Sequence, residues 1–272
     1  MPQVYWQSLF LLLTAGAVVL GVRRGLGMLA WLVVPVLFAM LGFLVKYGFD
    51  YGDIGATRNF LFSTRLVDFS SQSVLVALGH ALFTLGVGVG TGISYGAYAP
   101  QSVPIGRSIM AVAVFDTVIA LLAGLAIFPI VFANHMEPTA GPGLLFISLP
   151  YAFGNLMQGE LVGAVFFVMM VLAALGSAVA LMEPVVAMLV QQARLSRCTA
   201  ALIVGAIVWL LGWVIVVSLQ SGQVLPWFGK QHLLAVLDAL TARVLLPLVA
   251  LLIAVVAGWR LRPEILRLEL VR

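Results

Sequence analysis

Long apolar runs separated by short polar segments dominate the chain and predict helices that cross a lipid bilayer. A helix needs roughly 20 apolar residues to cross a hydrocarbon core of ~30 Å. Seven segments meet this requirement, at residues 4–22, 26–46, 73–98, 109–133, 161–190, 199–219 and 233–259. Longer polar connections occupy residues 49–72 and 134–160, and residues 260–272 form a basic tail. We therefore expect an all-α membrane protein, with residues 1–272 forming a single transmembrane domain.

The third of these spans is interrupted in its middle by glycine. Residues 82–98 contain five glycines, four of them at every second position from Gly86 to Gly92. Each glycine costs about 1 kcal/mol of helix stability relative to alanine. Inside a bilayer, backbone leaves the helix only where it faces protein or a water-filled cavity. The segment therefore predicts either a broken helix around a polar ligand or close helix packing through small residues.

Composition supports a membrane protein and excludes several other classes. The chain is 63% hydrophobic and 9% charged, with a mean hydropathy of +1.16. The single Cys198 has no partner for a disulfide, and His80, His135 and His232 lack the spacing of a zinc site. The net charge of +4 comes from loop arginines without interleaved aromatic residues, so we expect no nucleic-acid partner. The first apolar run lacks a basic leader, and we expect no cleavable signal peptide.

The distribution of basic residues predicts the orientation of the seven spans. Nine lysines and arginines fall on one side of the membrane, and four fall on the other side in much longer loops. The first group is Arg23, Arg24, Arg107, Arg194, Arg197, Arg260, Arg262, Arg267 and Arg272; the second is Lys46, Arg58, Arg65 and Lys230. The positive-inside rule then places the amino terminus outside and the carboxyl terminus in the cytoplasm. We expect a multi-pass protein of the plasma (inner) membrane.

Charged and hydroxyl side chains inside the spans are candidates for function. Asp116 lies in the fourth span with no basic residue near it in sequence, which favours an ion or proton ligand over a helix-packing acid. Thr84 and Ser177 supply hydroxyl oxygens suited to hard cations. Taken alone, each is more typical of a packing hydroxyl or one bonded to its own helix backbone.

Two further acids have plainer interpretations. Glu183-Pro184 predicts a break late in the fifth span, with the carboxylate at the membrane interface. Asp238 and Arg243 are five residues apart in the last span and do not align for a simple helical pair. We expect each to meet a partner on another helix or water.

Several strings in the chain resemble the neurotransmitter:sodium symporters, which share the LeuT fold. The strings are ALFTLGVGVG at 81–90, SYGAY at 94–98, FDT at 115–117, AGLAIFP at 123–129, GPGLLF at 141–146, AALGSA at 173–178 and EPVV at 183–186. The resemblance runs from about residue 6 to residue 268 and matches the family's fourth to tenth helices. It implies seven transmembrane helices of the LeuT-type inverted-repeat fold, with residues 82–98 as the helix that is unwound at mid-membrane.

The resemblance also implies a set of site residues. Positions matching the family's amino-acid pocket are Phe83, Thr84, Gly86, Gly88, Val89, Ser177 and Leu181. Positions matching sodium ligands are Thr84 and Asp116 in a first site and Ala173 and Ser177 in a second. Tyr98 matches a cytoplasmic-gate tyrosine and Asp238 an outer-gate acid.

Three departures from the family pattern affect this interpretation. Gly176 stands where the family usually places a sodium-binding threonine. Asp116 stands where many members have asparagine, and Ala120 follows one turn later, so we expect that chloride is not required. The family's first three helices, which supply half of each sodium site, have no counterpart in the sequence.

We interpret the chain as the carboxyl-terminal portion of a symporter that couples Na⁺ to an amino acid with an apolar side chain by alternating access. The alternative is a truncated, non-transporting remnant, or a partner subunit that acts with the missing amino-terminal helices or with another membrane protein. Membrane lipid is the expected surrounding. An intramembrane enzyme is disfavoured because Asp116 is accompanied by no nucleophile–base pair and no metal cluster.

Overall fold

The computed structural model describes residues 2–22, 25, 27–63, 70–100, 103–138, 141, 143–221 and 233–260. Some residues used in the sequence predictions lie outside these ranges. They are His232, the tail from residue 261 onward, and seven of the basic residues that predict orientation: Arg23, Arg24, Arg65, Lys230, Arg262, Arg267 and Arg272.

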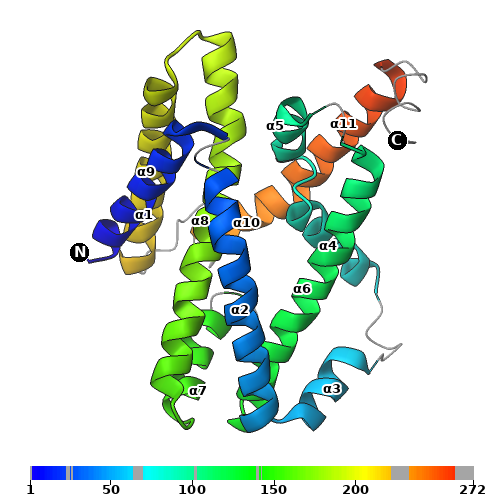
Figure 1. Ribbon diagram of the computed structural model, residues 1–272, viewed down its shortest axis with the longest axis vertical. Coiled ribbons are helices and arrows are strands. Elements are labelled where there is room, and N and C mark those ends of the chain that lie inside the picture. Colours follow the sequence, from blue (N-terminus) through cyan, green and yellow to red (C-terminus); the bar gives the residue numbers. More distant parts are fainter. Residues whose placement is uncertain are drawn as a thin grey trace. The chain divides into compact units, whose positions relative to one another are not determined.

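The described residues form helices and no strands (Figure 1). The elements are α1 (Pro2–Val19), α2 (Gly27–Tyr51), α3 (Ile54–Phe62), α4 (Ser71–Thr84), α5 (Thr91–Tyr98), α6 (Ile105–Ala133), η3 (Leu144–Ser148), α7 (Leu149–Gly154), α8 (Gly159–Gln192), α9 (Arg197–Ser221), α10 (Leu233–Leu240), η4 (Thr241–Leu245) and α11 (Leu246–Arg260). Among them, five helical stretches are long and apolar enough to cross a membrane: α2, α6, α8, α9 to Leu219, and the continuous α10–η4–α11. The all-helical membrane class predicted from the sequence is confirmed.

Two connections expected as loops contain helices of their own. The first holds α3, whose N-cap residue Asp53 accepts a hydrogen bond from the backbone N–H of Ala56 at 2.9 Å. A side-chain oxygen at the N-cap satisfies one of the otherwise unpaired donors of a helix start. The second holds the π-helical turn η3 followed by α7.

The chain divides into two compact units, and each is described by itself. The first unit comprises residues 1–28, 68–113 and 177–272, and the second comprises residues 29–67 and 114–176. The second unit contains a continuous buried core from α2, α6, η3–α7 and α8. Its members are Leu41, Leu44, Tyr47, Ala126, Ile130, Val131, Leu149, Ala152, Phe153, Val162 and Phe166.

In the first unit, α1 and α9 lie side by side (Figure 1) and are joined by polar contacts. The Gln7 side-chain amide donates to the backbone carbonyl of Trp209 at 3.0 Å. The Trp209 indole N–H donates to the Ser8 hydroxyl at 2.8 Å. Lipid offers no hydrogen bonds, so such contacts fix the register of two otherwise apolar helices.

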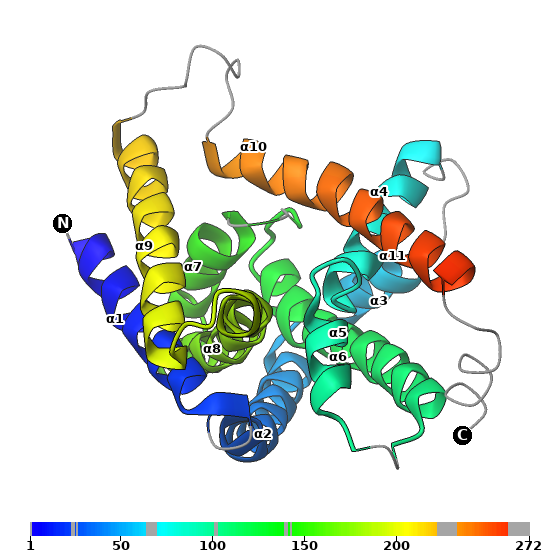
Figure 2. The same ribbon diagram turned by 90° about the horizontal axis from the view of Figure 1, so that it is seen from above.

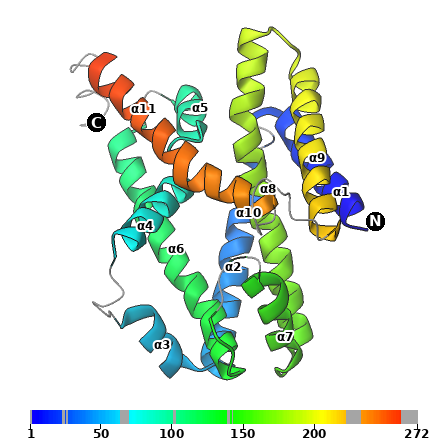
Figure 3. The ribbon, with the colours of Figure 1, turned by 180° about the vertical axis from the view of Figure 1, so that it is seen from behind.

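The last span of the first unit is continuous from α10 through η4 to α11 (Figure 3). It passes alongside α4, which contacts both η4 and α11 (Figure 2). Gly79 permits this approach, because a Cβ there would lie 3.1 Å from the Ala242 carbonyl oxygen. This packing positions the carboxyl end of α4, where the candidate site begins.

Candidate functional site

The segment between α4 and α5 leaves the helix over residues 85–90. Gly86, Gly88 and Gly90 have φ values of +68°, +88° and +84°, while Gly92 belongs to α5. Backbone with positive φ costs an L-residue about 1–2 kcal/mol, a cost that glycine avoids. The alternating spacing of the glycines therefore marks a broken helix, the first of the two possibilities left by the sequence.

Gly88 is required by packing as well as by conformation. A Cβ at this position would lie 2.9 Å from the Leu246 carbonyl oxygen of α11 and 3.4 Å from the Ala250 backbone nitrogen. Both obstacles are backbone atoms of a helix, which cannot move aside as a flexible side chain can. The broken segment therefore lies directly against α11.

Hydrogen bonds hold the broken segment in one conformation. The Val87 N–H donates to the Leu82 carbonyl at 2.9 Å, and the Gly86 N–H donates to the Phe83 carbonyl at 3.1 Å. The Thr91 hydroxyl of α5 reaches back to the Gly86 carbonyl at 3.3 Å. These bonds replace the helical ladder, as backbone at membrane depth requires.

A cavity of about 390 Å³ lies beside the broken segment within the first unit. It is lined by residues 85–88, 90, 92 and 93, by Ser108, Ile109 and Val112 of α6, and by Ile253 of α11. The lining is mainly apolar, and its polar groups are backbone atoms together with the Ser108 hydroxyl.

Four residues predicted to line the substrate site are exposed in the first unit. They are Phe83 (53% exposed) and Thr84 at the end of α4, and Ser177 and Leu181 (45% exposed) on α8. Gly86, Gly88 and Val89 are half-buried. The Thr84 hydroxyl donates to the Ala81 carbonyl at 3.3 Å, which is the backbone-bonded state that the sequence also allowed.

The predicted sodium ligands are divided between the two units. Thr84 and Ser177 belong to the first unit, and Asp116 and Ala173 belong to the second. Asp116 is half-buried on α6, and Ala173 is exposed on α8. The two sodium sites therefore stay predictions.

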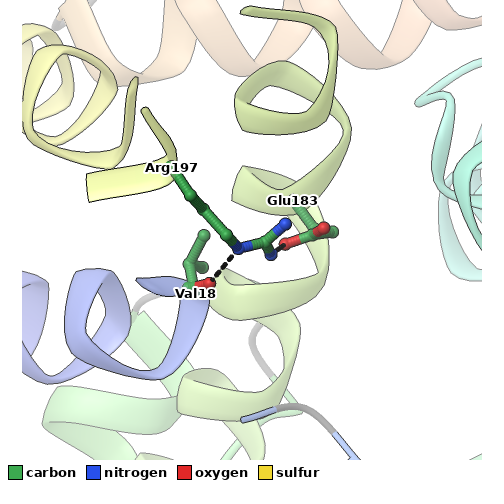
Figure 4. A network of polar contacts seen from close by, with 3 residues as sticks. All are labelled: Val18, Glu183 and Arg197. Atoms are coloured by element: carbon green, nitrogen blue, oxygen red, sulfur yellow. Dashed lines mark hydrogen bonds and ion pairs between the residues drawn. The ribbon is translucent and has the colours of Figure 1, made fainter. Parts of the chain in front are cut away.

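The predicted cytoplasmic-gate tyrosine belongs to a polar cluster that the sequence did not indicate. Arg197, the first residue of α9, forms an ion pair with Glu183 of α8 and interacts electrostatically with the side chain of Tyr98 on α5. The Nε of Arg197 also donates to the Val18 carbonyl of α1 at 2.8 Å (Figure 4). Four helices of the first unit meet at this arginine.

The helix break expected at Glu183-Pro184 was wrong. The helix α8 continues through Pro184, and Glu183 is 2% exposed and ion-paired with Arg197. Its expected position at the membrane interface stays a prediction. The missed signal is Arg197, which follows Glu183 by fourteen residues on the next helix. An acid within an apolar span requires a compensating partner, and this arginine is the basic residue that supplies it.

A π-helical turn changes the relation between Asp238 and Arg243. Both side chains are exposed, and η4 (Thr241–Leu245) lies between α10 and α11 in the same continuous span. The hydrogen bonds of a π-turn join residues five apart, so the extra residue brings positions 238 and 243 closer to a common face. The assignment of Asp238 as an outer-gate acid stays a prediction.

Broken transmembrane helices of this kind define a class of membrane transporters. The model of the sodium:neurotransmitter symporter family matches residues 2–264. An uncharacterized sodium-dependent transporter of Bacillus subtilis, YhdH, is 33% identical over 248 residues, which cover 91% of this chain and 55% of the relative. A sodium-dependent transporter of Haemophilus influenzae is 27% identical over 266 residues, covering 96% and 57%.

A comparison with solved structures leads to the same family. The crystal structure of MhsT in complex with L-phenylalanine matches with a TM-score of 0.87 and 33% identity, over 98% of this chain and 61% of that one. The chain belongs to the sodium:neurotransmitter symporter family. It spans little more than half the length of the relatives it matches.

Proposed function

We propose that the chain takes part in sodium-coupled symport of an amino acid with an apolar side chain, as the carboxyl-terminal portion of a symporter. The observation that carries the proposal is the break between α4 and α5, which leaves Phe83 and Thr84 exposed beside the left-handed glycines. The phenylalanine bound by the related MhsT supports an apolar amino acid as the substrate. A Drosophila grimshawi relative named sodium-dependent nutrient amino acid transporter 1 supports the same substrate class.

In this proposal the two helix ends at the break act on the substrate with their main-chain groups. Carbonyl groups at the end of α4 attract the ammonium group, and N–H groups at the start of α5 attract the carboxylate. Phe83, Val89 and Leu181 contact the apolar side chain. Thr84 and Asp116 bind one sodium ion, and Ala173 and Ser177 bind a second.

The proposed topology has seven spans with the amino terminus outside. The five long apolar helices are completed by α1, with 18 residues, and by the interrupted α4–α5 pair. Arg107, Arg194, Arg197 and Arg260 then face the cytoplasm of a cell bounded by this plasma membrane. Asp116 supplies a fixed negative charge, so the proposed symport needs no chloride.

The second candidate is a non-transporting subunit or remnant. The exposure of Thr84, Ser177 and Leu181 favours it, because a complete transporter buries its substrate residues from lipid and from bulk water. Partners in this case are the family's amino-terminal helices or another membrane protein.

Uptake by the purified 272-residue chain in liposomes separates the two candidates. Labelled L-phenylalanine is supplied with an inward sodium gradient, and choline replaces sodium in the control. With gluconate as the anion throughout, sodium-dependent accumulation that is lost in Asp116→Asn but kept in Asp50→Asn, an exposed acid of α2, supports symport. Equal uptake with sodium and choline rejects symport by this chain and leaves the subunit candidate.

A further inference from the structure

Glu183 is a carboxylate enclosed by the first unit. It is 2% exposed and occupies α8, a helix of otherwise apolar character. One of its oxygens, Oε2, binds the Arg197 guanidinium. Arg197 is itself fixed by the Val18 carbonyl, as Figure 4 shows. The pair therefore joins an enclosed carboxylate to an arginine whose side chain is 26% exposed, and three helices hold it.

The second carboxylate oxygen is left without a partner. Oε1 of Glu183 is buried and accepts no hydrogen bond from the described residues. The hydroxyl of Tyr95, on α5, is also buried and unpartnered within the same part of the chain. Tyr95 and Glu183 interact electrostatically. The cluster thus contains a buried acceptor with an unused lone pair and a buried hydroxyl that can accept or donate a hydrogen bond.

The negative charge of Glu183 is balanced by one cation among the described residues. Among the described side chains that interact with it, Arg197 is charged and Tyr95 is neutral. Tyr98, also neutral, reaches the cluster through Arg197. Removing one member of a buried ion pair leaves an uncompensated charge in a medium of low dielectric, which is strongly unfavourable. Arg197 can leave this cluster readily only if Glu183 is neutralised when it does so.

We propose that Glu183 is a proton-binding site and that the separation of Arg197 from Glu183 is coupled to the uptake of one proton. The carboxylate takes the proton from a hydronium ion in the water on the Arg197 side, which becomes water as its O–H bond breaks. An O–H bond forms at Oε1, and Glu183 becomes a carboxylic acid. The new O–H donates to the Tyr95 hydroxyl, and Arg197 leaves with its charge into water. The inference rests on the proposed function in one respect, that the Tyr98–Arg197 contact opens during a transport cycle.

Amide hydrogen exchange of the full chain in detergent measures this opening without sodium or substrate. Opening that binds one proton becomes about tenfold more favourable for each unit by which pH falls. We expect exchange of residues 91–98 and 197–201, after correction for the intrinsic pH dependence of amides, to increase with that slope. In Glu183→Gln, a neutral isostere of the protonated acid, we expect high exchange that is independent of pH. A flat wild-type profile overturns the proposal, and so does a slope that persists in Glu183→Gln.

Two further variants complete the test. Glu160→Gln neutralises the exposed acid in the first turn of the same helix and should keep the wild-type slope. Tyr95→Phe removes the proposed acceptor and should lower exchange at every acidic pH while keeping the slope. If Tyr95→Phe has the same exchange-against-pH profile as the wild type, Tyr95 is not the acceptor. Tyr95→Phe also replaces Glu183→Gln as the test variant if Glu183→Gln does not fold. If amide exchange does not depend on pH while sodium-dependent uptake is intact, the proton site alone is rejected. If exchange changes tenfold for each pH unit while the chain shows no sodium-dependent uptake, the symport proposal alone is rejected.

Discussion

The backbone of Gly88 lies so close to α11 that a Cβ on it would meet the Leu246 carbonyl oxygen at 2.9 Å. Gly88→Ala adds this contact to the strain of a left-handed backbone, which costs about 1–2 kcal/mol. We expect a lower melting temperature in detergent. Gly92→Ala is the matched control, because it lies in α5 with open space around it and gains up to about 1 kcal/mol of helix propensity. Equal melting temperatures for the two variants would contradict the close packing.

Arg197→Met should lower the free energy of unfolding by more than the position of Arg197 at a helix end indicates. The substitution leaves the Glu183 carboxylate buried and unpaired, which costs about 3–5 kcal/mol. The double variant Glu183→Leu/Arg197→Met should lose less stability than Arg197→Met alone, because it leaves no buried charge. Denaturant unfolding of the three proteins measures the difference. Arg194→Met, at an exposed arginine, should change stability by less than about 0.5 kcal/mol.

Gly212→Ala tests the polar contact between α1 and α9. A Cβ at Gly212 would lie 2.2 Å from the Gln7 amide nitrogen, so the amide must turn away and lose its bond to Trp209. Such a bond is worth about 1 kcal/mol. Gly16→Ala, on α1 with open space around it, gains helix propensity without this loss. We expect Gly212→Ala to be less stable than Gly16→Ala by roughly 1 kcal/mol, measured by thermal unfolding.

Tyr47→Phe tests the core of the second unit. The Tyr47 hydroxyl donates to the Met157 carbonyl at 2.5 Å, which ties the end of α2 to the connection before α8. Its removal should cost about 0.5–1.5 kcal/mol. Tyr51→Phe, at an exposed tyrosine whose ring contacts that of Tyr47, removes a hydroxyl without this bond and should leave stability unchanged. A smaller loss for Tyr47→Phe than for Tyr51→Phe would refute the assignment.

Asp116→Asn tests the proposed independence from chloride. The wild-type chain should bind labelled phenylalanine equally in sodium chloride and sodium gluconate, because Asp116 supplies the negative charge. The variant should bind only when chloride is present. Binding that depends on chloride in the wild type would refute this role for Asp116.

The sequence predicts the helical membrane class and the broken helix well, because both depend on local properties. Apolar run length determines which segments can cross a bilayer, and glycines at 86, 88 and 90 occur where the backbone needs positive φ. The family resemblance adds candidate residues, but Thr84 and Asp116 fall in different units and their pairing stays a prediction. What the sequence missed depends on contacts between distant residues. Pro184 indicates a helix break locally, yet packing keeps α8 whole, and Arg197 neutralises Glu183 from another helix.

The alternation of the three left-handed glycines has a consequence for mutational scanning. The conformation of this segment is set by main-chain geometry, so substitutions at Gly86, Gly88 and Gly90 should be rejected while those at the exposed Leu85 and Val87 are accepted. Substitutions that are accepted at every second position are the pattern expected of a β-strand, whose side chains alternate between two faces. A scan of this chain interpreted from tolerance alone would therefore place a strand in the middle of a membrane helix.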